Sequence, residues 1–189
     1  ERMGEAGKPR PAGPLVWIHA ASVGESLSIL ELSRRMLDEN PDLHCLITTG
    51  TTTSAAALAG RMHKRMMHQF IPLDVKSAVD TFLDYWKPDL AIWSESELWP
   101  SLLVGTKNRD IPLVLVNARM SEKSYKLWRW WRGTASAILG RFDYAMSQDA
   151  ATAEYLLKLG MPDDKVEVAG SLKEGSAPLP HDEFARGAL

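Results

Sequence analysis

Cysteine is nearly absent from this sequence, which excludes two kinds of covalent or metal stabilisation. Cys45 is the only cysteine among the 189 residues, so neither an intrachain disulfide nor a multi-cysteine metal site can form. A lone cysteine also fits a reducing compartment. Because Cys45 lies in the apolar stretch LHCLI, we interpret it as a small buried hydrophobic residue.

Long apolar runs and a strong charge imbalance are lacking too. No stretch reaches the roughly 18 apolar residues of a transmembrane helix, and no charged start with an apolar core marks a signal peptide. The formal net charge is -2 and the pI is about 6.2, so the overall charge gives no indication of a nucleic-acid partner. With 45% hydrophobic and 24% charged residues, the composition is typical of a soluble globular domain with a substantial core.

Several signatures of catalytic and binding sites are also missing. No Gly-x-Gly-x-x-Gly follows the first predicted strand, and no Gly-x-x-x-x-Gly-Lys-Ser/Thr occurs, which excludes two common phosphate-binding loops. The stretch SVGES lacks the nucleophile-elbow pattern of many hydrolases. His63 and His68 are five residues apart without an acidic partner, so we interpret them as surface histidines and predict no metal site.

What the sequence does contain is a regular alternation of short apolar runs and amphipathic patterns. The predicted strands are 14–20, 44–49, 68–73, 88–96, 111–118, 142–148 and 165–170. The predicted helices are 26–40, 54–66, 75–86 with Asp74 as its N-cap, 98–110, 121–140 as one broken helix or two, and 150–160. Strands that are apolar on both faces and separated by helices predict an α/β fold, a Rossmann-like three-layer domain with a mainly parallel sheet.

In such a sheet, ligands bind beyond the carboxyl ends of the strands. Among the loops at this edge, the one after the first strand carries Glu25 and the one after the fourth carries Glu95 and Glu97. Two carboxylates from separate strand ends suit a general-base reaction on a hydroxyl group. The spacing alone favours the other interpretation of Glu25, an ordinary acidic residue in the first turn of a helix, where the dipole favours its ionised form. The residues alone leave both interpretations open.

Five ordered motifs carry a resemblance to a known family. They are WIHAASVGES, ITTGTTTSA, ESELWPSL, LVNARMSEKS and GSLKEG. In this order and at these separations they resemble the N-terminal half of the bacterial transferases of 3-deoxy-D-manno-octulosonic acid (Kdo), over nearly the whole chain. The resemblance implies one half of a GT-B glycosyltransferase, which is inverting and independent of metal or other cofactors.

The resemblance also implies the substrates and the domain organisation. The donor is CMP-Kdo, bound mainly by a C-terminal domain, and the acceptor is the lipid A precursor lipid IV(A), at the cytoplasmic face of the bacterial inner membrane. The chain begins without methionine and ends in a proline-interrupted segment, so we expect it to be a piece of a longer protein. We expect residues 1–13 to be a lead-in after a membrane anchor, 14–175 the acceptor-binding domain and 176–189 a linker toward the donor domain.

Roles for individual residues follow from the same motifs. Glu25 matches the family's general base, and Glu95 and Lys173 match positions associated with transition-state stabilisation. A lysine near the departing phosphate suits the negative charge that develops there. The predicted substrate-binding residues are Ser22, Gly24, Thr49, Thr51, Glu97 and Arg119. Ser171 stands where the family usually has asparagine, which puts details of acceptor binding in doubt.

Two segments combine basic with large apolar side chains. Residues 61–68 (RMHKRMMH) join cations to methionines, and residues 126–132 (KLWRWWR) interleave three cations with three tryptophans. Such a surface suits an anionic lipid interface, whereas core packing is the alternative for the tryptophans. We expect Trp130 to be exposed and Trp128 or Trp131 to be buried. Single-stranded nucleic-acid binding is disfavoured by the acidic loops nearby and the net negative charge. The alternative to a transferase is a non-catalytic carbohydrate- or anion-binding module with a Rossmann-like fold, in which Glu25 is only a residue at the start of a helix.

Overall fold

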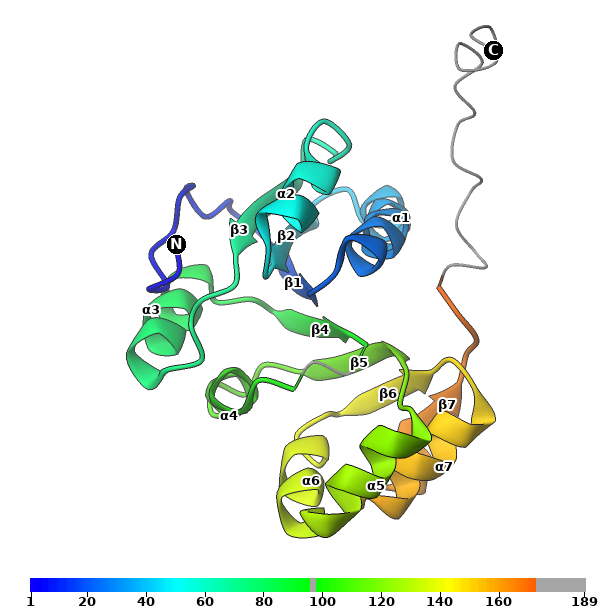
Figure 1. The fold of residues 1–189 in the computed structure, drawn as a ribbon. Helices are drawn as coiled ribbons and strands as arrows, with labels where there is room; N and C mark the ends of the chain where they lie inside the picture. The colour runs from blue at the N-terminus through cyan, green and yellow to red at the C-terminus, as the bar shows by residue number, and fades with distance from the viewer. Residues whose placement is uncertain (96–97, 173–189) are drawn as a thin grey trace, which may run out of the picture.

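The computed structural model describes residues 1–95 and 98–172 of the chain. Seven parallel strands form a sheet in the order β3-β2-β1-β4-β5-β6-β7, as Figure 1 shows. The strands are β1 (Leu15–Ala20), β2 (His44–Thr49), β3 (Met66–Phe70), β4 (Leu90–Ser94), β5 (Leu113–Ala118), β6 (Tyr144–Ser147) and β7 (Val166–Val168). The predicted parallel sheet is confirmed.

Helices cover both faces of this sheet. They are α1 (Val23–Glu39), α2 (Thr52–Leu58), α3 (Lys76–Trp86), α4 (Pro100–Lys107), α5 (Glu122–Trp130), α6 (Arg132–Leu139) and α7 (Ala150–Lys158). One apolar cluster joins a sheet face to α1 and α2, and a second joins the opposite face to α3, α4, α6 and α7. The three-layer α/β architecture is therefore confirmed, and the segment 121–140 forms two helices that meet at Trp131.

Aromatic rings fill the layer between the sheet and α3. The ring of Trp17 lies 4.9 Å from that of Phe82 and 4.9 Å from that of Trp93. Trp17 Nε1 donates to Thr48 Oγ1 at 2.9 Å, and Trp86 Nε1 donates to Gln69 Oε1 at 2.9 Å. The polar atoms of these two buried tryptophans are thus paired, which removes the cost of burying them.

The second helix is shorter than predicted. It ends at Leu58, Gly60 follows with a φ of +73°, and Met66 already pairs with Cys45 in the sheet. The methionines of residues 61–68 therefore belong to the core: Met66 is buried, and Met62 and Met67 pack against the two apolar clusters. The lipid-facing interpretation of this segment was wrong for its methionines.

Arg65 of the same segment also serves the fold. Its guanidinium donates to the carbonyl oxygens of Leu37, Asn40, Pro41 and Leu43 at 2.6–3.1 Å. These carbonyls lie at and just beyond the C-terminus of α1, where backbone acceptors have no partner within the helix and a cation is favoured. Arg65 therefore closes the end of α1.

The prediction that Asp74 caps α3 was wrong. The N-cap of α3 is Val75, which makes no side-chain hydrogen bond to the helix. The carboxylate of Asp74 instead accepts from the backbone N–H groups of Ser101 at 3.2 Å and Leu102 at 2.8 Å. Asp74 therefore caps α4, a helix that begins 26 positions further along the chain.

Residues 1–13 lie against α3 and the edge strand β3. The Glu1 carboxylate accepts from the backbone N–H of Phe70, and Arg10 Nε donates to the carbonyl of Trp86 at 2.6 Å. Gly4 has a φ of +86°, and a Cβ there would lie 2.1 Å from the carbonyl oxygen of Ala78. Only glycine fits so close to the backbone of α3. The segment thereby covers an edge of the sheet.

Candidate functional site

The chain winds away from the middle of the sheet in two directions. From β1 it proceeds through β2 to β3 on one side, and from β4 through β5 and β6 to β7 on the other. The loops after β1 and β4 therefore diverge, although the two strands pair side by side through His19 and Trp93. In open α/β sheets such a topological switch point, at the carboxyl edge, is where ligands bind. The candidate acids Glu25 and Glu95 follow these two strands.

Glu25 is fixed at the start of α1 by a reciprocal pair of hydrogen bonds. Its backbone N–H donates to Ser22 Oγ at 3.2 Å, and its Oε2 accepts from the backbone N–H of Ala21 at 3.0 Å. This arrangement resembles a capping box, which satisfies free donors at a helix N-terminus. Glu25 is only 5% exposed, whereas Ser22 and Gly24 beside it are exposed. The carboxylate is therefore held in one orientation at the switch point.

Glu95 has an unusual backbone conformation. Its φ is +59°, and its backbone N–H donates to the carbonyl of Val116 at 3.0 Å. Asn117, directly after Val116 on the adjacent strand β5, has a φ of +54°. Left-handed backbone at a residue other than glycine costs on the order of 1 kcal/mol, and such strain gathers at functional sites. Two strained residues thus lie at the ends of neighbouring strands.

Not every predicted site residue lies in the described part of the chain. Glu97 and Lys173 lie outside it. Arg119 follows β5 and is exposed, at the same edge of the sheet as Glu25 and Glu95. Because β1, β4 and β5 are neighbours in the sheet, the structure gathers the loops of these three residues at one edge.

The two predicted threonines differ in their surroundings. Thr49 is fully buried, and its Oγ1 lies 2.9 Å from His68 Nε2. Thr51 is the exposed N-cap of α2, and its Oγ1 accepts from the backbone N–H of Ser54 at 3.2 Å. His68 is therefore not the solvated surface histidine that we expected; burial also lowers its pKa. Ser54 Oγ donates to the carbonyl of Ala21 at 3.3 Å, which ties α2 to the loop that holds Glu25.

Sequence reasoning missed three buried polar groups near the ends of β1, β4 and β5. His19 Nε2, Ser94 Oγ and Asn117 Nδ2 have no hydrogen-bond partner within the described residues. Nδ1 of His19 lies 3.2 Å from the carbonyl oxygen and 3.1 Å from the hydroxyl oxygen of Thr48; the carbonyl can only accept, so its bond requires the proton on Nδ1. Burial lowers the pKa of His19 to about 4, so the ring is neutral at pH 7. The sequence did offer one signal for these three groups, because each is a polar residue near the end of an apolar run.

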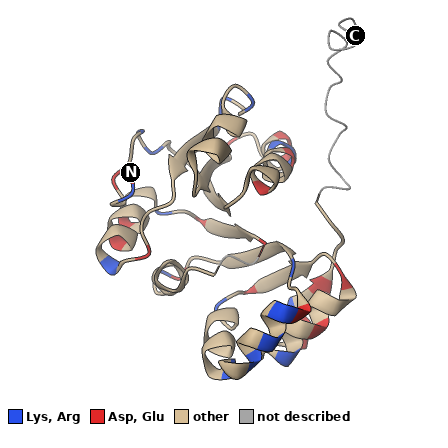
Figure 2. Ribbon diagram, in the orientation of Figure 1, with Lys and Arg blue, Asp and Glu red and all other residues tan. Residues whose placement is uncertain are grey.

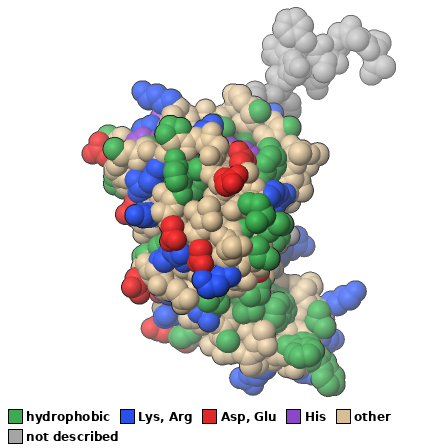
Figure 3. Space-filling view, turned by 90° about the vertical axis from the view of Figure 1, so that its left-hand side faces the viewer, with side chains coloured by type: hydrophobic (Ala, Val, Ile, Leu, Met, Phe, Trp, Pro, Cys, Tyr) green, Lys and Arg blue, Asp and Glu red, His purple; other side chains and the backbone are tan. Residues whose placement is uncertain are grey.

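Helices α5 and α6 form an exposed apolar and basic surface. Trp130 is 84% exposed, as we predicted, and Leu127 is 64% exposed. The expectation that Trp128 or Trp131 is buried was wrong, because Trp131 is 66% exposed and Trp128 packs only partly against the core. Figure 2 shows basic residues along α5, and Figure 3 shows apolar and basic side chains together at the lower end of the molecule, where α5 and α6 lie. Tryptophan exposed to this degree is unusual in a folded domain.

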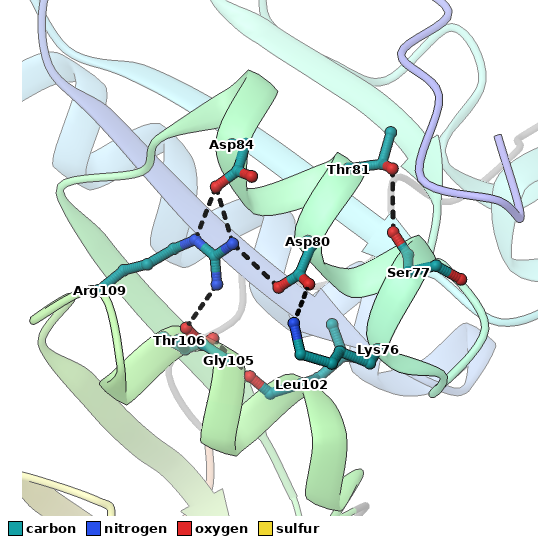
Figure 4. A network of polar contacts seen from close by, with 9 residues as sticks. All are labelled: Lys76, Ser77, Asp80, Thr81, Asp84, Leu102, Gly105, Thr106 and Arg109. Carbon is teal, nitrogen blue, oxygen red and sulfur yellow. Dashed lines mark hydrogen bonds and ion pairs between the residues drawn. The ribbon is translucent and has the colours of Figure 1, made fainter.

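A second polar cluster lies between α3 and α4, where a groove of about 320 Å³ runs. Arg109 donates to Asp84 at 2.7 Å and to Asp80 at 3.0 Å, and Lys76 contacts Asp80 at 2.5 Å (Figure 4). Hydrogen bonds from Lys76 and Arg109 lower the pKa of Asp80. These charges pair with one another, so we interpret the cluster as a structural link between two helices.

Within residues 1–95 and 98–172, no three acidic, histidine or cysteine side chains form a group that could hold a metal ion.

Comparison with known sequences identifies relatives of the whole domain. The family model described as 3-deoxy-D-manno-octulosonic-acid transferase (kdotransferase) matches residues 1–175. The "3-deoxy-D-manno-octulosonic acid transferase" of Rickettsia felis is 37% identical over 169 residues, which are 89% of this chain and 36% of that protein. The "Probable 3-deoxy-D-manno-octulosonic acid transferase, mitochondrial" of Arabidopsis thaliana is 41% identical over 128 residues, 68% of this chain and 29% of that protein.

Solved structures share the fold at low sequence identity. A UDP-GlcNAc 2-epimerase from Neisseria meningitidis, bound to UDP-GlcNAc, superposes with a TM-score of 0.61 at 14% identity. The match covers 85% of this chain and 47% of the epimerase. This likeness concerns the fold alone, and it identifies the domain as similar to one half of a GT-B enzyme.

The described part of the chain has no helix with both the length and the apolar character needed to cross a bilayer.

The chain spans about a third of the length of the curated relatives named above. Because the family model covers residues 1–175 and a relative is 37% identical over most of the chain, the chain belongs to the 3-deoxy-D-manno-octulosonic acid transferase family.

Proposed function

We propose that this chain is the acceptor-binding half of an inverting glycosyltransferase that transfers Kdo from CMP-Kdo to lipid IV(A) in lipopolysaccharide biosynthesis. The observation that carries the proposal is the position of Glu25. Its buried carboxylate is held by Ala21 at the switch point of the sheet, where α/β proteins bind ligands. A carboxylate with a fixed orientation is what a general base requires.

In the proposed reaction, Glu25 accepts the proton of an acceptor hydroxyl. The hydroxyl oxygen then attacks the anomeric carbon of Kdo, the bond from that carbon to CMP breaks, and CMP leaves with the bonding electron pair. A single displacement inverts the configuration at the anomeric carbon. Glu95 and Lys173 are proposed to stabilise the charges that develop, the lysine through the leaving phosphate. Ser22, Gly24, Thr51 and Arg119, exposed at the same edge, are proposed to contact the acceptor, together with Glu97. The side chain of Thr49 is fully buried, so we propose that it supports this edge without direct contact to the acceptor. The reaction as proposed requires no metal.

We propose that the acceptor is reached at the membrane surface, at the cytoplasmic face of the bacterial inner membrane. The surface formed by Leu127, Trp130 and Trp131 supports this. Leu127 and Trp130 are three residues apart and share one side of α5, Trp131 follows directly at the junction with α6, and Lys123, Lys126, Arg129 and Arg132 are exposed nearby in the sequence. Tryptophan settles at the headgroup level of a bilayer, and cations attract anionic lipids.

The experiment that tests the transfer joins this chain to a C-terminal donor half of the family. Transfer of Kdo from CMP-Kdo to lipid IV(A) is measured for the joined enzyme and for its Glu95→Gln and Lys173→Ala variants. We expect turnover in the joined enzyme, at least a hundredfold loss in each variant and no turnover by the 189-residue chain alone. Turnover by the chain alone would contradict the proposed division of labour between two domains.

A non-catalytic carbohydrate- or anion-binding module is the second candidate. The hydrogen bonds at Ser22 and Ala21 favour it, because they explain Glu25 as a capping residue without any chemistry. If the joined enzyme binds lipid IV(A) but transfers no Kdo, this second candidate replaces the first.

A further inference from the structure

Asn117, the next-to-last residue of β5, has a backbone conformation that few residues adopt. Its φ is +54°, which asparagine and glycine tolerate best. The residue is only 2% exposed. The residue before it, Val116, accepts a hydrogen bond from the backbone N–H of Glu95. Asn117 therefore lies directly beside the strand end that carries a proposed catalytic acid.

The amide of Asn117 holds a segment that is distant in the sequence. Its Oδ1 accepts from the backbone N–H of Leu172 at 3.1 Å. Because a backbone N–H can only donate, this contact identifies the side-chain oxygen and fixes which way the amide faces. The backbone carbonyl of Asn117 accepts from Gln148 Nε2 at 3.0 Å, so the loop after β6 holds the same residue from its main chain.

The segment after β7 returns toward the middle of the sheet. Ala169 donates to the carbonyl of Ser147, which continues the pairing of β7 with β6. Gly170 follows with a φ of +80°, and Leu172 packs against the apolar cluster on the α1 face. Since β6 separates β7 from β5, residues 170–172 must pass the end of β6 to reach Asn117. Figure 1 shows this short stretch in orange, leaving β7.

We propose that Asn117 is a positioning residue, whose side-chain oxygen holds residues 170–172 at the carboxyl end of β5, beside Glu95. Leu172 immediately precedes Lys173 in the sequence. Asn117 therefore acts on catalysis through the segment that leads to this lysine, a consequence that rests on the proposed function. The placement of residues 170–172 does not depend on that function.

Hydrogen exchange in this chain tests the placement directly. Asn117→Gly removes the amide and keeps a residue that tolerates positive φ, so loss of the contact is not confused with backbone strain. Asn117→Asp keeps an acceptor oxygen. We expect the Leu172 amide to exchange on the order of tenfold faster in the glycine variant and within about twofold of the parent in the aspartate variant. The amides of Ile18 and Ile47 in the core strands report the stability of the whole domain.

Two results would overturn the placement. One is unchanged exchange of the Leu172 amide in Asn117→Gly. The other is acceleration of the Leu172, Ile18 and Ile47 amides by one common factor, because this indicates general destabilisation. If Asn117→Asp unfolds the domain, the glycine variant still decides between these outcomes, since it buries no charge.

A double-mutant cycle in the joined two-domain enzyme tests the link to catalysis. We expect Asn117→Gly to lower kcat about tenfold in the parent enzyme and less than about twofold once Lys173→Ala is present, because residues that act as a unit are not additive. If Asn117→Gly lowers kcat by the same factor with and without Lys173→Ala, the two residues act independently and the link between Asn117 and Lys173 is wrong. If Lys173→Ala leaves turnover unchanged while the exchange result holds, the proposed role of the lysine fails and the placement by Asn117 stands.

Discussion

Glu25 Oε2 lies 3.0 Å from the backbone nitrogen of Ala21, so the fold itself uses one oxygen of the proposed catalytic base. A capping residue needs only an acceptor atom, which glutamine also supplies, whereas a general base needs a carboxylate. The structural role and the chemical role of Glu25 can therefore be separated by substitution.

The first prediction is that Glu25→Gln loses activity and keeps stability. We expect kcat of the joined enzyme to fall by about a hundredfold or more, while the free energy of unfolding changes by less than about 0.5 kcal/mol because the cap persists. Glu25→Ala should lose activity as well and about 1 kcal/mol of stability. Turnover assays and urea denaturation give the two readouts. Near-normal turnover in Glu25→Gln would leave Glu25 with the capping role alone.

The second prediction concerns the cap that Asp74 provides to α4. Asp74→Ala leaves the backbone N–H groups of Ser101 and Leu102 without this acceptor, so we expect the free energy of unfolding to fall by about 1–2 kcal/mol. Asp38→Ala is the matched control, because Asp38 is an exposed aspartate in α1 and should change stability by less than about 0.5 kcal/mol. Equal effects of the two substitutions in urea denaturation would argue against the cap.

The third prediction compares two glycines in helices. A Cβ at Gly105 would lie 2.6 Å from Val79 Cγ1 and 3.2 Å from Leu83 Cδ1, so α4 packs closely on α3 at this point. We expect Gly105→Ala to cost about 1–3 kcal/mol through overpacking. Nothing lies within 4 Å of a Cβ at Gly133 in α6, so Gly133→Ala should be neutral or stabilise by up to about 1 kcal/mol. Thermal unfolding of both variants checks the contrast, which fails if Gly105→Ala is neutral.

Local patterns predicted most of the fold. The strands that are apolar on both faces, such as β1 and β5, and the strongly periodic helix α3 begin and end close to their predicted limits. The error at residues 59–66 has a physical cause, since unbranched methionine fits a helix or a strand and only the pairing of Met66 with Cys45 decides between them. Likewise, the partner of the Asp74 carboxylate lies on another helix, which no local pattern can indicate.

The candidate site was predictable only where a residue lies within a few positions of the end of a strand. Glu25 and Glu95 lie at the carboxyl edge because they follow β1 and β4, and parallel pairing brings the ends of these strands together. The order of the strands, and with it the switch point, is not contained in the alternation of elements. The contact between Asn117 and Leu172 spans 55 positions and required the three-dimensional arrangement.

The fourth prediction is a loss of stability in acid that depends on His19. Its pKa is about 4 in the folded state, against 6.5 for an ordinary histidine, so the unfolded state binds the proton more tightly. The stability due to neutral His19 is therefore fully present above pH 6.5 and is lost as the pH falls toward 4, by on the order of 3 kcal/mol.

Urea denaturation between pH 7.5 and 4.5 measures this loss for the parent chain and for His19→Gln. The variant should lose less stability over this range, because glutamine does not titrate. His68 is present in both proteins, so its own lowered pKa contributes equally to the two curves. Parallel curves would show that His19 does not titrate as expected.

The fifth prediction is that the 189-residue chain binds anionic vesicles through α5 and α6. We expect co-sedimentation with vesicles of phosphatidylglycerol mixed with phosphatidylcholine, and little with phosphatidylcholine alone, since each cation near an anionic surface contributes about 1 kcal/mol. Replacing Trp130 and Trp131 together by serine should weaken binding at least tenfold at any salt concentration, because the apolar contribution is lost.

The control and the charge variant separate the two contributions to vesicle binding. Leu73→Ser removes an exposed apolar side chain near α3 and should leave binding unchanged. Replacing Arg129 and Arg132 by glutamine should weaken binding mainly at low salt, where surface charges are least screened. If the parent chain self-associates in sedimentation velocity and the tryptophan variant does not, while the variant binds vesicles normally, the α5–α6 surface is an interface between copies of the chain. Loss of binding in Leu73→Ser would instead place the membrane contact near α3, and the tryptophans would then need another explanation.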